Sequence, residues 1–85
     1  MKYKIILKNP AKKFIKKLDQ HIKKRILDRL AKLEENPKTG IPLGGDMRGL
    51  WKLREREYRI IYQIIQNELI IYVLNANHRK KSYKH

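Results

Sequence analysis

Lysine and arginine side chains are interleaved with tyrosines in two separate parts of this chain. One part is the C-terminal stretch NHRKKSYKH, which contains no acidic residue. Cations around a phosphodiester stabilise the negative charge of its transition state, and one well-placed donor contributes ~2.7–4 kcal/mol. These residue types raise the question whether the fold assembles them into a pocket for a phosphodiester. The other part, in the middle of the chain, contains Lys52, Arg54, Arg56 and Arg59.

Cleavage of RNA without a metal needs a base, an acid and a set of cations. The base takes the proton of a 2′-hydroxyl, the cations hold the phosphorane, and the acid protonates the departing 5′ oxygen. Nearby cations lower the pKa of a tyrosine or lysine because they favour its less positive form. A crowd of cations would thus make Tyr83 or Lys52 usable near neutral pH, and a tyrosine ring can also stack on a base.

Each of these features also has a purely structural interpretation. A charged strand face is commonly the solvated side of a half-buried sheet, and a basic tail is commonly an electrostatic arm. Tyr58, Tyr62 and Tyr72 suit core or cross-strand packing, and Trp51 suits a core anchor. From the residues alone, the prediction is a basic α+β domain directed at RNA.

Other catalytic or ligand-binding arrangements find no support in the sequence. The chain has three histidines and no cysteine; His21 is far from the other two and His85 is terminal, so no metal site is predicted. The segment GIPLGGD lacks the lysine and the context of a phosphate-binding loop. Ser82 and Thr39 are the single serine and threonine, without a histidine–carboxylate pair nearby. We therefore expect no cofactor.

The charge balance points to a polyanionic partner. Twenty-two Lys and Arg residues against eight Asp and Glu give a formal net charge of +14. A folded domain this basic repels itself unless an anion is near, and nucleic acid is the usual polyanion. The alternative is a Lys-rich surface of the kind common in hyperthermophiles.

Length and hydropathy predict one domain, residues 1–85, with no membrane partner. No apolar run approaches the ~20 residues that a membrane span needs. The N-terminal apolar run of three residues is too short for a signal peptide. Absence of cysteine suits a reducing compartment, and the predicted location is the cytoplasm.

The first half of the chain predicts a strand and two helices. Residues 2–8 are typical of a short strand that ends at Asn9-Pro10, where Asn9 would cap a helix. Apolar residues then recur at steps of three and four, and Asp19 would cap a second helix, so we expect a helical hairpin or a kink near residues 18–20. The pattern stops at Asn36-Pro37. The apolar positions are 11, 14, 15, 18, 22, 26, 30 and 33.

The second half predicts a loop over residues 36–49 and then three strands: LWKLRER, YRIIYQIIQ and LIIYVLN. Their short connections indicate antiparallel neighbours. In the first of them, Lys52, Arg54 and Arg56 would share one face, opposite Trp51 and Leu53. The predicted fold is α+β, β-α-α-β-β-β: a small antiparallel sheet with an N-terminal helical hairpin packed on one face.

The segments LWKLREREYRIIYQI and ANHRKKSY, in this order and spacing, resemble the RelE toxin family of type II toxin–antitoxin systems. The resemblance covers nearly the whole chain and implies the same small antiparallel sheet with a helix pair. It also implies ribosome-dependent endoribonuclease activity, with cleavage of mRNA in the A site by attack of the 2′-OH and without a metal. The partners implied are the ribosome, mRNA and a cognate acidic antitoxin like RelB.

Roles for individual residues follow from the same resemblance. Arg59 would stabilise transition-state charge, and Arg79 would contact the scissile phosphate and act as, or assist, the general acid. Tyr83 would stack on or orient the nucleotide, or share proton transfer, while Lys52 would bind substrate and serve as base. Some relatives carry a second lysine at the position of Leu50, which leaves the identity of the base open.

Five more residues complete the predicted site. Histidine is the residue type whose ordinary pKa lies closest to neutrality, so His78 is a second candidate for base or acid; its alternative is a loop histidine without a role. The RNA-binding residues would be Arg54, Arg56, Lys80 and Lys81.

Two other functions remain open at this point. The ParE branch has the same fold and inhibits DNA gyrase by binding, without nuclease activity. That branch generally lacks the Arg and Tyr residues of the cleavage set, which this chain has in its tail. A basic RNA-binding module without toxicity is the third possibility.

Overall fold

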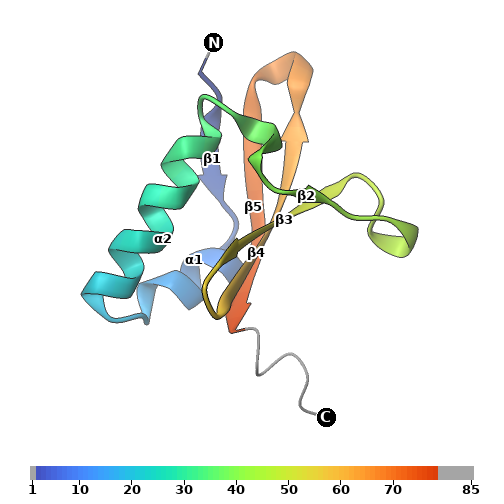
Figure 1. The fold of residues 1–85 in the computed structure, drawn as a ribbon. Coiled ribbons are helices and arrows are strands. Elements are labelled where there is room, and N and C mark those ends of the chain that lie inside the picture. Colours follow the sequence, from blue (N-terminus) through green and yellow to red (C-terminus); the bar gives the residue numbers. More distant parts are fainter. Residues whose placement is uncertain (1, 79–85) are drawn as a thin grey trace.

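The computed structural model describes residues 2–78, which form two helices on one face of a five-stranded sheet (Figure 1). The strand order is β1-β5-β4-β3-β2. This confirms the α+β class and adds one short edge strand to the predicted order. In chain order the elements are β1 (Lys4–Leu7), α1 (Asn9–Lys16), α2 (Gln20–Leu33), β2 (Ile41–Pro42), β3 (Leu50–Glu55), β4 (Tyr58–Ile65) and β5 (Ile70–His78).

The sheet is mixed because β1 pairs parallel with β5, whereas all the other neighbours are antiparallel as predicted. Parallel pairing needs a long crossover, and the helices and the other strands provide it between β1 and β5. β2 was not predicted, since a two-residue strand that contains Pro42 is visible only through its pairing with β3.

The predicted helical hairpin is confirmed, with a different cap at its start. Lys8 is the extended residue before α1, and Asn9 already lies inside the helix with Pro10 in the first turn. Asn9 is therefore not the cap, because proline fits the second helical position as well as the first. Asp19 occupies the cap position of α2, although its side chain makes no capping hydrogen bond.

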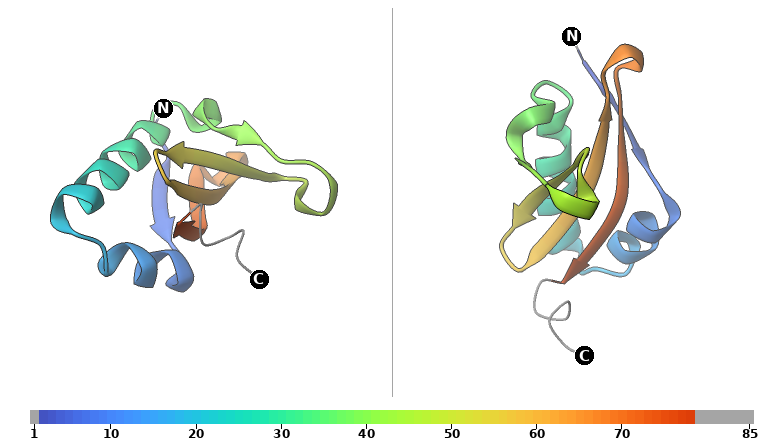
Figure 2. Two further views of the ribbon diagram at one scale, coloured as in Figure 1. Left: turned by 60° about the horizontal axis from the view of Figure 1, so that its bottom comes forward. Right: turned by 90° about the vertical axis from the view of Figure 1, so that its right-hand side faces the viewer.

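The core lies between the helices and one face of the sheet. Views from below and from the side show both helices on that face, whereas the loop after β2 projects away from them (Figure 2). We call the opposite side of β3, β4 and β5 the open face. The buried residues are Ala11, Ile15, Ile26, Leu30 and Leu33 of the helices, with Leu53, Tyr58, Ile60, Tyr62, Ile71, Val73 and Ala76 of the strands.

A register shift between β4 and β5 changes which residues of β5 reach the open face. Ile61 pairs with Asn75 and the next residue, Tyr62, pairs with Val73, so Leu74 is an extra residue in β5. Val73 and Ala76 are both buried although they are an odd number of positions apart. Such a bulge reverses the alternation of side chains beyond it.

The β3–β4 hairpin has a tight turn at residues 56 and 57. Lys52 and Arg54 lie on the open face and Leu53 on the helix face, as predicted. Arg56 was expected on the same strand face but belongs to the turn, with a left-handed φ of 56°. Because the turn ends the alternation of β3, Arg56 does not continue the row of cations.

No helix among residues 2–78 is long and apolar enough to span a membrane. The same residues contain no cluster of three or more His, Asp or Glu that could hold a metal ion.

Candidate functional site

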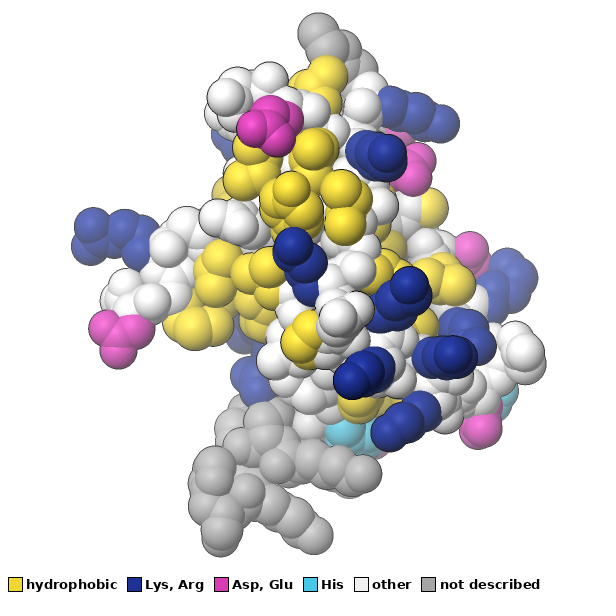
Figure 3. Space-filling model, turned by 180° about the vertical axis from the view of Figure 1, so that it is seen from behind, with side chains coloured by type: hydrophobic (Ala, Val, Ile, Leu, Met, Phe, Trp, Pro, Cys, Tyr) yellow, Lys and Arg dark blue, Asp and Glu magenta, His cyan; other side chains and the backbone are white. Residues whose placement is uncertain are grey.

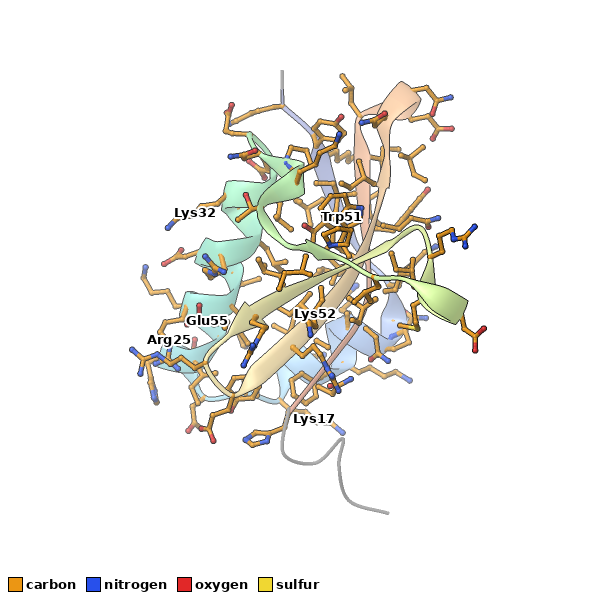
Figure 4. All side chains as sticks on the ribbon, turned by 45° about the vertical axis from the view of Figure 1, so that its right-hand side comes forward. Lys17, Arg25, Lys32, Trp51, Lys52 and Glu55 are labelled. Atoms are coloured by element: carbon orange, nitrogen blue, oxygen red, sulfur yellow. The ribbon has the colours of Figure 1, made fainter. Side chains whose placement is uncertain are left out.

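A pocket of about 360 Å³ lies on the open face, where β3, β4 and β5 meet the loop after β2. β3 supplies Lys52, which is labelled in Figure 4, and β4 supplies Arg59. Two cations, two amides and an apolar wall thus converge from separate parts of the chain. The lining residues are Leu43, Met47, Lys52, Arg59, Ile61, Asn75 and Asn77.

Lys52 and Arg59 are brought together by the register of the β3–β4 hairpin. Lys52 is paired with Ile61, so Arg59 is its diagonal neighbour on the same face. Diagonal side chains on one sheet face are ~7–8 Å apart at the backbone and within reach of each other when long. Both side chains are half-buried. A phosphate held between them would contact both cations.

Arg54 stands directly opposite Arg59 in this register. Like charges at directly opposite positions destabilise a sheet. Within the described residues, neither arginine nor Lys52 forms an ion pair with an acid. The pocket therefore has a net positive charge that an external anion would neutralise.

The segment before β2 is attached to the helix face of the sheet by Tyr62. Its hydroxyl donates a hydrogen bond to the carbonyl of Pro37 (2.7 Å) and accepts one from the N–H of Gly40 (3.0 Å). The Trp51 ring stacks on Tyr62 with centroids 6.2 Å apart. Burial raises the pKa of Tyr62, and the hydrogen bond from Gly40 opposes this. Tyr62 is thus a structural residue, as the packing interpretation predicted.

Gly40 allows the segment before β2 to approach the sheet this closely. A Cβ at this position would lie 2.6 Å from the carbonyl oxygen of Lys52 and 2.6 Å from the hydroxyl of Tyr62. Because side chains of other residues would meet the backbone of β3, the close approach of the segment before β2 to the sheet depends on this glycine.

His78 lies on the opposite face of the sheet from Lys52 and Arg59. It pairs in register with Tyr58, and the two rings meet edge to face at 5.2 Å. Its Nε2 is 3.5 Å from a carboxylate oxygen of Glu57. The geometry argues against His78 as the base at a phosphate held by Lys52 and Arg59, because the bulge in β5 turns its side chain towards the helices.

The other predicted site residues are Arg79, Lys80, Lys81 and Tyr83, and all four lie outside the described residues.

Two residues of the pocket were missed by the sequence interpretation, Asn75 and Asn77. Asparagine is depleted in strands, so two asparagines two positions apart near a strand end were a usable signal. Period-two alternation would have placed them on the same face as Val73, in the core. Only the bulge places them on the open face.

A second and larger hollow, of about 580 Å³, runs along α2 beside Leu27. All of its lining comes from this one helix, and its acidic residue, Asp28, is 3.0 Å from Lys24. Because no second element contributes groups to it, the smaller pocket is the better candidate for chemistry.

The comparisons with known proteins agree with this fold. Residues 5–83 match the family described as the ParE toxin of the type II toxin–antitoxin system. A protein of Escherichia coli described as RelE-like is 33% identical over 87 residues, which cover 96% of this chain and 88% of that protein. The chain belongs to the RelE/ParE superfamily of toxins. It is therefore the toxin of a type II toxin–antitoxin system.

Solved structures place the toxin in the same fold. The toxin in the RelBE complex of Mycobacterium tuberculosis superposes with a TM-score of 0.84 at 24% identity, covering 92% of each chain. The archaeal RelE–RelB complex of Pyrococcus horikoshii gives a TM-score of 0.78 at 25% identity, covering 93% of this toxin and 97% of that chain. The RelE architecture predicted from the sequence is thereby confirmed.

Proposed function

We propose that this toxin is a ribosome-dependent, metal-independent endoribonuclease that cuts mRNA in the ribosomal A site and so inhibits translation. The observation that carries the proposal is the pocket in which Lys52 and Arg59 converge without an acidic neighbour among the described residues. A site that binds only an already folded protein partner has no need for unpaired cations around a small cavity. A phosphodiester fits such a cavity by charge and by size.

The reaction forms one bond and breaks another at the same phosphorus. The 2′ oxygen attacks, its proton passes to a base, and the bond from phosphorus to the 5′ oxygen breaks as an acid protonates that oxygen. The products are a 2′,3′-cyclic phosphate and a 5′-hydroxyl. Lys52 and Arg59 would hold the charge of the phosphorane, which is where preorganised cations contribute most.

From the resemblance to RelE, Lys52 is also the residue for which we propose the role of base. Arg54 would be a supporting phosphate contact. From the resemblance to RelE, Arg79 would hold the scissile phosphate and assist as acid, and Tyr83 would orient the nucleotide. Lys80, Lys81 and the turn residue Arg56 would bind RNA.

The ribosome would be bound through the remaining basic surface. Seen from behind, Lys and Arg side chains gather on the part of the surface near the helices, whereas the strands expose hydrophobic side chains (Figure 3). α1 alone carries Lys12, Lys13 and Lys16, all exposed. Contacts of this kind with ribosomal RNA weaken steeply with salt. Since translating ribosomes are the proposed target, we place the toxin in the cytoplasm.

An acidic antitoxin is the second partner that we propose. The similar structures from Mycobacterium tuberculosis and Pyrococcus horikoshii are RelBE and RelE–RelB complexes. A chain with a net charge of +14 would be neutralised by a RelB-like acidic partner.

Inhibition of DNA gyrase is the alternative function, and the match to the ParE family description favours it. It requires no reactive group on the toxin. Two assays on the same preparation separate the functions: cleavage of message on programmed ribosomes, and supercoiling by gyrase.

We expect A-site cleavage by the wild-type toxin and unchanged supercoiling. The double variant Arg79→Ala, Tyr83→Phe should fold normally and lose cleavage, whereas Asn67→Ala, on the exposed turn between β4 and β5, should cleave like the wild type. Message cleaved by the double variant at the wild-type rate, or gyrase inhibited while message stays intact, would show that the nuclease assignment is wrong.

A further inference from the structure

The pocket contains a hydrogen-bond acceptor that its cations do not explain. Asn77 lies directly opposite Arg59 in the β4–β5 pairing, and both line the pocket. Its Oδ1 is buried, and within residues 2–78 nothing donates a hydrogen bond to it. A buried acceptor without a partner costs folding free energy, so such an atom is expected to have a partner in the functional state.

The neighbouring amide has the complementary arrangement. Asn75 uses its Oδ1 to accept a hydrogen bond from the N–H of Ala76 (2.9 Å), which fixes the side chain beside the bulge. Its NH₂ group is therefore the part left for a ligand. Together with Lys52 and Arg59 it supplies donors, which phosphate oxygens require. Asn77 Oδ1 cannot bind a phosphate oxygen, because both atoms are acceptors.

The missing partner of Asn77 must thus be a donor that lies next to a phosphate. In RNA the 2′-hydroxyl is this donor, since its carbon is adjacent to the one whose oxygen carries the phosphorus. The N–H groups of the bases lie farther away, beyond the glycosidic bond. DNA has no donor at the 2′ position, which is the group that lets a protein distinguish RNA from DNA.

We propose that Asn77 binds the 2′-hydroxyl of the nucleotide whose 3′-phosphate lies between Lys52 and Arg59, so that the pocket selects ribose over deoxyribose. The inference rests on the proposed nuclease function and assigns a substrate contact within it. An amide does not take a proton near neutral pH, so Asn77 binds and orients the nucleophile and is not the base. The bulge at Leu74 serves this contact by turning Asn77 to the open face.

The test is a cycle that changes the protein and the sugar together. Ribosomes are programmed with messages whose target nucleotide carries a 2′-amino group, which keeps a donor, or a 2′-hydrogen, which does not. Neither provides the hydroxyl nucleophile, so dissociation constants of the active toxin can be measured. We expect the wild type to bind the amino message about fivefold more tightly, as one hydrogen bond implies.

Three variants show whether the preference for the amino message depends on Asn77. Asn77→Ala should bind both messages equally, Asn77→Asp should retain the preference because it keeps an acceptor, and the control Asn67→Ala should behave like the wild type. The two modified sugars also differ in pucker. This difference affects binding to the wild type and to every variant equally, so it cancels when their preferences are compared. An undiminished preference in Asn77→Ala would overturn the assignment.

Failure of the proposed function has a different signature. Unmodified message that the wild-type toxin neither binds nor cuts on ribosomes would remove the nuclease and this contact together. Unmodified message that is cut normally by a wild-type toxin with no amino preference would overturn the role of Asn77 alone.

Discussion

The two faces of the β3–β4 hairpin use cations in opposite ways. On the helix face, Glu55 has a side chain only 13% exposed, and its carboxylate lies 3.4 Å from Arg25 Nε and 3.3 Å from Arg29 Nε. Figure 4 shows Glu55 beside Arg25 of α2. On the open face, Lys52 and Arg59 have no such acid among the described residues. Cations that share a carboxylate hold the helix to the sheet, whereas unmatched cations remain available for an external anion.

Glu55 attracts the two arginines by charge, without hydrogen bonds from their Nε atoms. Both arginine Nε atoms are buried without a hydrogen-bond partner, although each is within ion-pair distance of the carboxylate. Arg29 donates instead from Nη2 to the carbonyl of Arg54 (3.1 Å). This hydrogen bond links α2 to β3, the strand that also carries Lys52 of the pocket. Contacts on the helix face therefore stabilise a strand of the pocket.

The largest expected effect comes from removing a cation of the open face. Lys52→Ala or Arg59→Ala should each reduce cleavage on ribosomes about 10²- to 10³-fold, because each removes a donor to the phosphorane. The free energy of unfolding should stay within about 0.5 kcal/mol of the wild type, as for surface changes. Single-turnover cleavage and urea titration measure the two quantities. A large loss of stability with little loss of rate would assign these cations to the fold.

Removing the acid of the helix face should reduce the free energy of unfolding more than the cleavage rate. Glu55→Ala leaves the arginines around it without their carboxylate, and we expect a loss of about 2–3 kcal/mol in the free energy of unfolding, below the value for fully buried pairs because the arginines are partly exposed. The matched control is Asp28→Ala, which removes the exposed pair with Lys24 and should cost less than about 0.5 kcal/mol. Equal losses in the two variants would contradict the structural role of Glu55.

The attachment of the segment before β2 to the sheet offers a smaller and more local change. Gly40→Ala places a Cβ against the Lys52 carbonyl and the Tyr62 hydroxyl, and overpacking of this kind costs about 1–3 kcal/mol. Gly44→Ala is the control, because nothing lies within 4 Å of its Cβ. Thermal unfolding of both variants compares them. The expected result is a lower unfolding temperature for the Gly40 variant alone.

The smallest effect is expected for Tyr62→Phe, at about 1–2 kcal/mol, because the Pro37 carbonyl and the Gly40 N–H lose their partner. The pH dependence of the free energy of unfolding distinguishes the wild type from this variant. Burial raises the pKa of Tyr62 above 10.0, so the folded toxin keeps this proton longer than the unfolded chain. The stability contributed by neutral Tyr62 is complete below about pH 10 and falls as the pH rises towards the folded pKa. The phenylalanine variant has no hydroxyl to titrate and should lack this decline, which unfolding measured between about pH 9 and pH 11 would reveal.

Local patterns in the sequence determined the helices, the long strands and the core. Steps of three and four between apolar residues placed Ala11 and Ile15 on the buried side of α1 and Ile26 on that of α2, because a helix repeats every 3.6 residues. The short turn between β3 and β4 brought Lys52 and Arg59 together, since a tight hairpin fixes its own register. The cationic part of the described pocket could be predicted for this reason.

The tertiary structure alone decided which side of β5 faces the pocket. Alternation within IIYVLNANH places Asn75 and Asn77 with Val73, but the extra residue Leu74 reverses the strand beyond it and sends His78 to the helix face. The parallel pairing of β1 and the short strand β2 were likewise hidden, because both depend on partners distant in the chain. A bulge is a property of two paired strands, and no local pattern in one of them specifies where it occurs.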